Sequence, residues 1–170
     1  MSGKKVKKSK YDWDSISDQD FEELCYDILI KEGFTNLEWV GRSGKDRGRD
    51  IKCNKIKHPL TNITSLENYL VQCKKYVARP PTIQEINETL TWADYHKPDV
   101  LLFMISHTIT SQTRDWLEKI SKDKFYEIIR YEEKYFDTFF RNNEDVYNDY
   151  FLNKKTYLDR EDILIKKDIL

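Results

Sequence analysis

The sequence predicts an α/β domain in which a central mixed β-sheet is flanked by helices on both sides. Two observations support this fold class. Segments with helical periodicity alternate with β-rich segments, in the order helix, three strands, helix, strand, helix, strand, helix. In addition, the segment Val100–Ile105 is apolar without interruption, which is typical of a strand that helices cover on both faces.

The N-terminal part of the chain should consist of an arm followed by a helix. Residues 1–14 are polar and rich in lysine, and we expect a flexible basic arm. The helix should begin directly after Ser17, which matches a capping box together with Asp20. Apolar residues recur at helical spacing over 21–29, and Gly33 is well placed to end this helix.

Three strands are expected before the second helix. Residues 37–40 and 51–54 have the composition of strands and flank a loop rich in glycine and charge. Residues 69–76 should form the third strand, which two consecutive prolines then stop. The polar segment 55–68 contains a further proline, and we expect it to be a long loop or to hold a short helix.

The second half of the predicted domain continues this alternation. Thr82 is a candidate cap for a helix that ends near His96, and Thr110 or Ser111 can cap the helix after the buried strand. Residues 126–131 have the pattern of a strand. The last short helix has an aromatic stripe that we expect to belong to the core, formed by Tyr135, Phe136, Phe139 and Phe140.

The chain is long enough for one domain with its own core. We expect that domain to cover residues 15–140. The composition changes in residues 141–170, which are rich in Asn, Asp, Lys and Tyr and contain only scattered aliphatic residues. They are expected to be a polar C-terminal extension or a linker to a further domain.

Composition narrows the class of protein. No apolar run has the length of a membrane span, and the basic start does not lead into a signal segment, so we expect a cytoplasmic protein. Cys25, Cys53 and Cys73 form no CxxC pair, which favours reduced thiols. The net charge of -1 excludes a global positive field, so DNA binding would depend on local basic patches.

Two short stretches carry the residues that suggest chemistry. Asp50 stands where the glycine-rich loop becomes a strand, a position in which a rigid scaffold can hold an exposed carboxylate. Gln72 and Lys74 are two residues apart in a predicted strand, so their side chains point to the same face. An amide oxygen and an ammonium group would therefore share one surface.

These residues carry a resemblance to a known family. Asp50 followed by Gln72-Cys73-Lys74 resembles the pattern of the Mrr-type restriction endonucleases, a branch of the PD-(D/E)xK nuclease superfamily in which Gln often replaces the acidic residue. Three more pieces match in order, namely Phe21-Glu22, Gly33-Phe34 and Asp46-Arg47-Gly48-Arg49-Asp50. The resemblance covers most of residues 15–140 and implies the restriction-endonuclease-like fold.

The resemblance implies a metal-dependent endonuclease that hydrolyses DNA phosphodiester bonds, with Mg²⁺ as cofactor and Mn²⁺ as a substitute. The catalytic residues that it implies are Glu22, Asp50, Gln72 and Lys74. The metal ligands that it implies are Asp50, Gln72, Glu22 and the backbone carbonyl of Cys73. Lys74 would orient the attacking water, and Glu22 would supply the carboxylate that Gln72 lacks. Asp46 would support the ligands indirectly or cap a turn.

The expected partner is double-stranded DNA. Candidate phosphate contacts are Arg42, Lys45, Arg47, Arg49 and Lys75. No helix-turn-helix, zinc or winged-helix pattern indicates how bases would be read. A homo-oligomer, namely a dimer, is expected when the enzyme is active, because one centre cuts one strand. A fused sensor or regulatory domain is a further candidate partner, and defence against foreign DNA is the expected setting.

One alternative remains open from the sequence. The chain would then be a catalytically inactive nuclease-fold module that binds DNA or mediates assembly. The presence of Asp50, Gln72 and Lys74 together favours the enzyme. Metal-dependent cleavage of plasmid DNA distinguishes the two.

Overall fold

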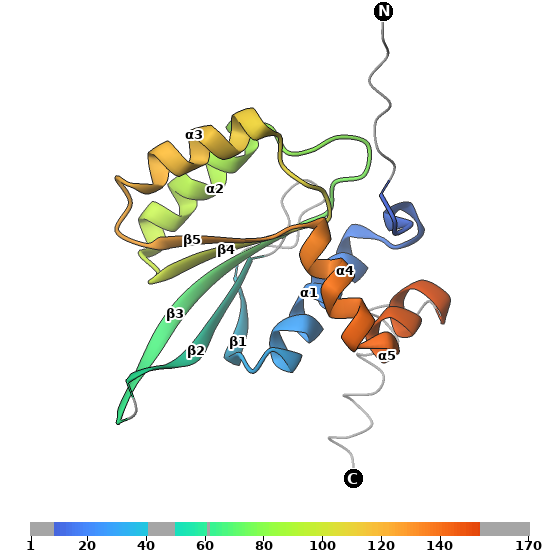
Figure 1. The fold of residues 1–170 in the computed structure, drawn as a ribbon, viewed down its shortest axis with the longest axis horizontal. Helices are drawn as coiled ribbons and strands as arrows, with labels where there is room; N and C mark the ends of the chain where they lie inside the picture. The colour runs from blue at the N-terminus through green and yellow to red at the C-terminus, as the bar shows by residue number, and fades with distance from the viewer. Residues whose placement is uncertain (1–8, 41–49, 61, 154–170) are drawn as a thin grey trace, which may run out of the picture.

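The computed structural model describes residues 9–40, 50–60 and 62–153, which form a five-stranded mixed sheet in the order β1-β2-β3-β4-β5 (Figure 1). The strands are β1 (Thr35–Val40), β2 (Asp50–Leu60), β3 (Ile63–Lys74), β4 (Val100–Ile105) and β5 (Glu127–Tyr131). The first three strands pair antiparallel, and β3, β4 and β5 pair parallel. The predicted mixed sheet is confirmed.

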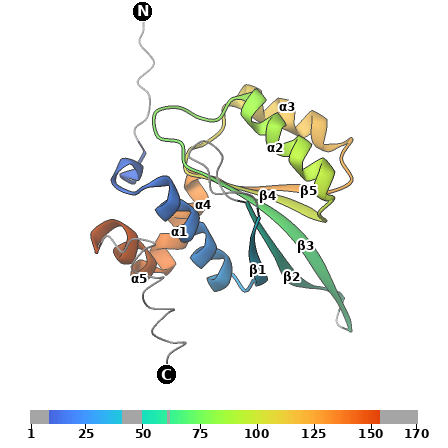
Figure 2. The ribbon, with the colours of Figure 1, turned by 180° about the vertical axis from the view of Figure 1, so that it is seen from behind.

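Helices cover both faces of this sheet, as predicted. They are η1 (Trp13–Ser15), α1 (Asp18–Lys31), α2 (Ile83–His96), α3 (Ser111–Ser121), α4 (Glu133–Asn142), α5 (Glu144–Tyr147) and the π-helical turn η2 (Asn148–Leu152). Figures 1 and 2 show α2 and α3 on one side of the sheet and α1, α4 and α5 on the other. None of the helices in the described ranges is long and apolar enough to span a bilayer.

Each face of the sheet packs against its own apolar core. In β3, Leu70 packs in the core with α2 and α3, while Val71 packs in the core with α1 and α4. All six residues of β4 are buried and alternate between the same two cores. This double burial explains why β4 has no polar position, because a strand between two helical layers has no solvent face.

The ends of α1 agree with the prediction. The Ser17 side chain accepts a hydrogen bond from the Asp20 backbone N–H, and the Asp20 carboxylate accepts one in return from the Ser17 backbone. At the other end Gly33 has a φ of 81°, a left-handed conformation that favours glycine. Its N–H donates to the Ile30 carbonyl, while the Phe34 N–H donates to the Leu29 carbonyl, which is a Schellman motif.

The segment 55–68 corrects the prediction of a loop. Strands β2 and β3 continue through it as a long hairpin, with Ile56 opposite Leu66 and Lys57 opposite Ser65. The hairpin extends beyond the helical layers (Figure 1), so no helix covers either face of β2 and β3 in this part of the hairpin. Apolar and polar residues alternate along a strand only where one of its faces is buried. Both faces of this part of the hairpin are largely exposed, so its sequence lacks the pattern that would have predicted strands.

The predicted N-terminal boundary is also wrong for the residues that are described. Trp13 is 1% exposed and lies in the core beside Phe21 and Phe136, although residues 1–14 were expected to be a flexible arm. The indole N–H of Trp13 donates to the Ser9 hydroxyl, which itself donates to Glu133 on α4. Residues 9–14 are therefore part of the folded domain, and residues 1–8 lie outside the described ranges.

The C-terminal boundary at residue 140 is likewise too early. Val146 and Tyr150 are buried in the core with α1 and α4, and the Tyr150 hydroxyl donates to Asp27 on α1. These apolar residues are spread over a short helix and a π-helical turn, so they form no regular helical stripe in the sequence. The rest of the expected extension, 154–170, lies outside the described residues.

Candidate active site

The pairing of β2 with β3 brings three of the predicted site residues together. Asp50, the first residue of β2, lies directly opposite Gln72, so their side chains share one face of the sheet. Lys74 follows two residues later on the same face. This is the face that α2 covers, because the Thr89 hydroxyl of α2 donates to Gln72 Oε1 at 3.1 Å.

Asp50 is a buried carboxyl group in an unusual environment. The residue is 8% exposed, and its Oδ1 has no hydrogen-bond partner among the described residues. Burial raises the pKa of Asp50 to about 7, and the charge of Glu22 raises it further, whereas the Trp92 side chain, through a hydrogen-bonding interaction, and Lys74 lower it. Such a carboxyl group is destabilising unless a cation or a proton compensates it.

Glu22 reaches the same region from the other helical layer. It lies on α1 and is 7% exposed, next to the buried Phe21. Its charge acts on Asp50 and also raises the pKa of the Cys73 thiol, for which burial and Cys25 are the larger causes. The structure therefore brings two carboxylates close to one another from β2 and α1.

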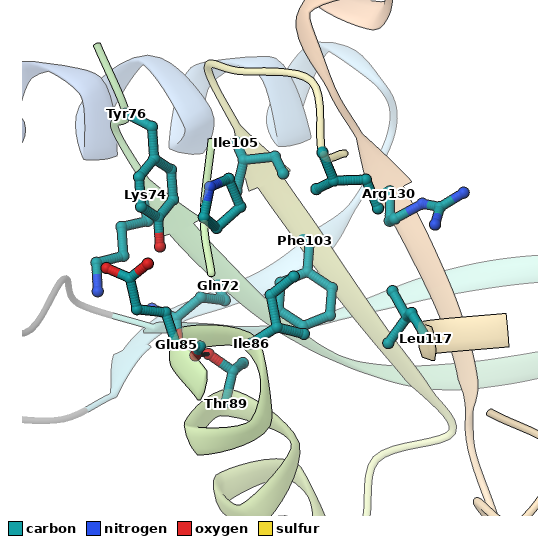
Figure 3. A pocket seen from close by; sticks show the side chains of 12 residues that line it. Gln72, Lys74, Tyr76, Glu85, Ile86, Thr89, Phe103, Ile105, Leu117 and Arg130 are labelled. Carbon is teal, nitrogen blue, oxygen red and sulfur yellow. Dashed lines mark hydrogen bonds between the residues drawn. The ribbon is translucent and has the colours of Figure 1, made fainter. Parts of the chain in front are cut away.

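A narrow crevice between β3 and α2 adjoins Gln72 and Lys74. Figure 3 shows these two side chains together with Glu85 and Thr89 of α2 along its walls. The Lys74 Nζ lies 5.8 Å from the centre of the Tyr76 ring. Because Thr89 fixes the amide oxygen of Gln72, that oxygen has a defined direction and still has one lone pair for a further partner.

Comparison with known proteins identifies the family of the chain. A protein-family model, that of the Mrr catalytic domain, described as restriction endonuclease, matches residues 13–130. The chain belongs to the Mrr restriction endonuclease family. No curated protein and no solved structure matched the chain. The family match supports a nuclease whose substrate is DNA, and it begins at the buried Trp13.

The candidate site has donor atoms of the kind that a hard divalent cation prefers. Within the described ranges, no group of three or more His, Cys, Asp or Glu residues is placed to hold a metal. Asp50 and Glu22 instead offer carboxylate oxygens and Gln72 offers an amide oxygen, and Oδ1 of Asp50 has no hydrogen-bond partner among the described residues. The Cys73 thiol is fully buried on the opposite face, so this residue could contribute only its backbone carbonyl. Oxygen donors of this kind suit a hard divalent cation.

Most of the predicted DNA contacts of the nuclease lie outside the residues that the structure describes. Arg42, Lys45, Arg47, Arg49 and the supporting Asp46 lie outside the described residues. Lys75 is described, and its position corrects the prediction. Its Nζ donates to the Ile16 carbonyl at 2.6 Å and lies 3.2 Å from Asp18, so it anchors the start of α1. We therefore do not retain Lys75 as a phosphate contact.

Two residues of the candidate site were not predicted from the sequence. Thr89 and Trp92 both lie on α2 and contact Gln72 and Asp50, respectively. Together with Glu85 they are spaced at i, i+4 and i+7, which places them on one stripe of the helix. This spacing was visible, but the sequence alone does not say that this stripe faces the ends of β2 and β3.

Proposed function

We propose that this nuclease hydrolyses DNA phosphodiester bonds with a divalent metal ion, Mg²⁺ in the cell and Mn²⁺ as a substitute. The observation that carries the proposal is the buried Asp50 carboxylate with an unpartnered oxygen, directly opposite Gln72 and on the same face as Lys74. Defence against foreign DNA in the cytoplasm is the setting that we propose, on the basis of the restriction endonuclease family.

The residues of the chain would divide the work as follows. Asp50, Glu22, Gln72 and the backbone carbonyl of Cys73 would hold the metal, which would neutralise phosphate charge and lower the pKa of a bound water. Lys74 would orient the attacking water and stabilise negative charge that develops on the phosphate. Thr89 would keep the Gln72 oxygen aimed at the site through its hydrogen bond.

Glu22 and its neighbour Glu23 allow a matched test of the second carboxylate. We expect Glu22→Gln to lower the cleavage rate by at least about 100-fold, since it removes a charged ligand beside an uncharged one. Glu23→Gln should leave the rate nearly unchanged, because Glu23 is half-buried and comes next on the helix, rotated away from Glu22. The measurement is the rate of plasmid cleavage under identical conditions. Equal losses in both variants would show that Glu22 has no special part in the site.

Plasmid cleavage tests the proposed activity itself. Supercoiled plasmid should be nicked in the presence of Mg²⁺ or Mn²⁺ and remain intact with EDTA. We propose that a dimer is needed for a double-strand break, so linear product should rise more steeply than protein concentration while mass in solution shows self-association. A purified protein that binds plasmid but never nicks it would favour the inactive module instead. A strictly monomeric protein that linearises plasmid in proportion to its concentration would rule out the dimer.

A further inference from the structure

A second cavity lies on the α2 side of the sheet, beside the proposed metal site. It has a volume of about 400 Å³ and lies between the C-terminal end of α2 and strands β1 to β3. Its polar lining includes Asn36, Glu38, Lys52, Asn54, Asn68 and His96. We call it the amide groove. Its volume is within the range of pockets that hold small ligands, about 300 to 1,000 Å³.

The floor of the amide groove is an ordered row of amide side chains from three strands. The Asn36 amide donates to Asn54 Oδ1 at 3.0 Å, and the Asn54 amide donates to Asn68 Oδ1 at 2.9 Å. Asn68 in turn donates to Asp99, which fixes the end of the row. Each amide group still has a hydrogen or a lone pair to offer, so the row presents oriented donors and acceptors to a ligand.

The conformation of Asn36 shows how this row is built. Asn36 has a φ of 54°, in the left-handed region that asparagine tolerates better than most residues. It lies where the register between β1 and β2 shifts, between Thr35 and Glu38. Such an irregularity can re-aim a side chain, and here the Asn36 amide bonds to Asn54.

Lys52 connects the amide groove to the proposed metal site. It follows Asp50 by two residues on the same face of β2, a step of about 7 Å along a strand. Within the described part of the chain Lys52 takes part in no ion pair, and its ammonium group could meet a phosphate.

On the α2 side the amide groove is lined by the ring of His96, which contacts the aromatic residues next to it on the helix. The His96 ring lies edge-on to Trp92 at 4.3 Å, and its buried Nε2 has no hydrogen-bond partner among the described residues. Trp92 is also stacked with Tyr95, at 5.9 Å between ring centres and 20° between planes, and Tyr95 is 77% exposed. Exposed aromatic faces near the groove suit a nucleobase, because any of the bases can stack on such rings.

We propose that the amide groove binds a nucleotide of the DNA strand next to the bond that is cut, with Lys52 on its phosphate and the amide row on the edge of its base. Asparagine side chains can read a base edge because they carry both a donor and an acceptor. Glu38 also lines the groove, opposite Lys52 on the neighbouring strand, and its carboxylate would disfavour a second phosphate there. This inference rests on the proposed nuclease activity and adds a source of sequence preference to it.

A pair of lysines on one strand tests the phosphate contact. Lys52 faces the amide groove, whereas Lys55 faces the other side of β2, with its Nζ 4.4 Å from the centre of the Phe34 ring. Binding of a fluorescent DNA duplex is measured by anisotropy at several salt concentrations, in the full chain carrying Lys74→Ala so that no DNA is cut. Lys52→Ala should weaken binding several-fold and reduce the slope of log K against log salt by about 1. Lys55→Ala should change neither.

The base contact is tested by Asn36→Gly in the active chain, since glycine keeps the left-handed backbone and removes only the amide. Sequencing of the DNA ends cut by the wild type should show a base preference near the cut. Asn36→Gly should weaken this preference, and Lys52→Ala should retain it. The proposal would be overturned if Lys52→Ala and Lys55→Ala affected binding equally. It would also be overturned if Asn36→Gly left the base preference at the cleaved ends unchanged. If the wild-type chain cuts no DNA, the nuclease proposal fails, while the lysine comparison still decides whether the groove binds DNA.

Discussion

Asp50→Asn is expected to abolish DNA cleavage and to make the metal-free protein more stable. Burial holds the Asp50 carboxyl at a pKa of about 7, roughly 3 units above that of an exposed aspartate, which corresponds to about 4 kcal/mol against the charged form at high pH. An amide of the same shape has no charge to desolvate, although it still loses hydration. We therefore expect the free energy of unfolding at pH 8 in EDTA to rise by about 2 kcal/mol.

The gain should depend on pH with a defined sign. The folded pKa of Asp50 is raised, so the folded state holds a proton between about pH 4 and 7 that the unfolded state has lost. Wild-type stability therefore falls relative to Asp50→Asn as the pH rises through this window, and below about pH 4 Asp50→Asn has no stability advantage over the wild type. Urea unfolding of both proteins at several pH values, with EDTA present, measures this difference.

Metal binding provides a second measurement on the same variant. Mn²⁺ or Mg²⁺ should raise the melting temperature of the wild type, because the cation binds the folded carboxylates, and should leave Asp50→Asn unchanged. Asp123→Asn is the matched control, since Asp123 is exposed and far from the site along the chain. An Asp50→Asn variant that is less stable than wild type and still shifts with metal would mean that Asp50 is a structural residue and not a ligand.

Trp13→Ala is expected to cost about 3 to 5 kcal/mol of stability, the range for a large aromatic residue removed from a core. Trp13 is 1% exposed and meets Phe21, Phe136 and Phe151 edge-on, so it joins α1, α4 and η2. Its removal would leave a cavity at the point where these elements meet. The measurement is the urea midpoint and slope of the full chain.

Phe125→Ala is the control for this prediction, because Phe125 is an aromatic residue that is fully exposed. It should change the unfolding free energy by less than about 0.5 kcal/mol. A Trp13→Ala protein that unfolds at the wild-type urea concentration would show that residues 9–14 are not part of the cooperative unit. In that case the predicted arm over 1–14 would be the better description of this segment.

Local signals determined several elements of this protein from the sequence alone. The capping box at Ser17, the glycine at position 33 and the apolar run Val100–Ile105 were each sufficient, because capping, left-handed backbone and double burial depend on a few adjacent residues. The common face of Gln72 and Lys74 follows in the same way from strand geometry.

The candidate site could be predicted only in part. The motif indicated Asp50, Gln72 and Lys74, but their closeness depends on the register in which β2 meets β3. Thr89 and Trp92 join the site only because one stripe of α2 packs over the ends of those strands. The amide groove likewise needs three strands, from Asn36, Asn54 and Asn68, to lie side by side.

The sequence by itself thus determined the type and the ends of most elements, the face on which Gln72 and Lys74 lie, and the family of the nuclease. The tertiary structure decided the length of the β2–β3 hairpin, the inclusion of Trp13 and Tyr150 in the domain, and the environment that raises the pKa of Asp50. The physical reason is the same in each case. Periodicity reports which residues avoid water, whereas pairing register and burial depend on which distant segments supply the neighbours.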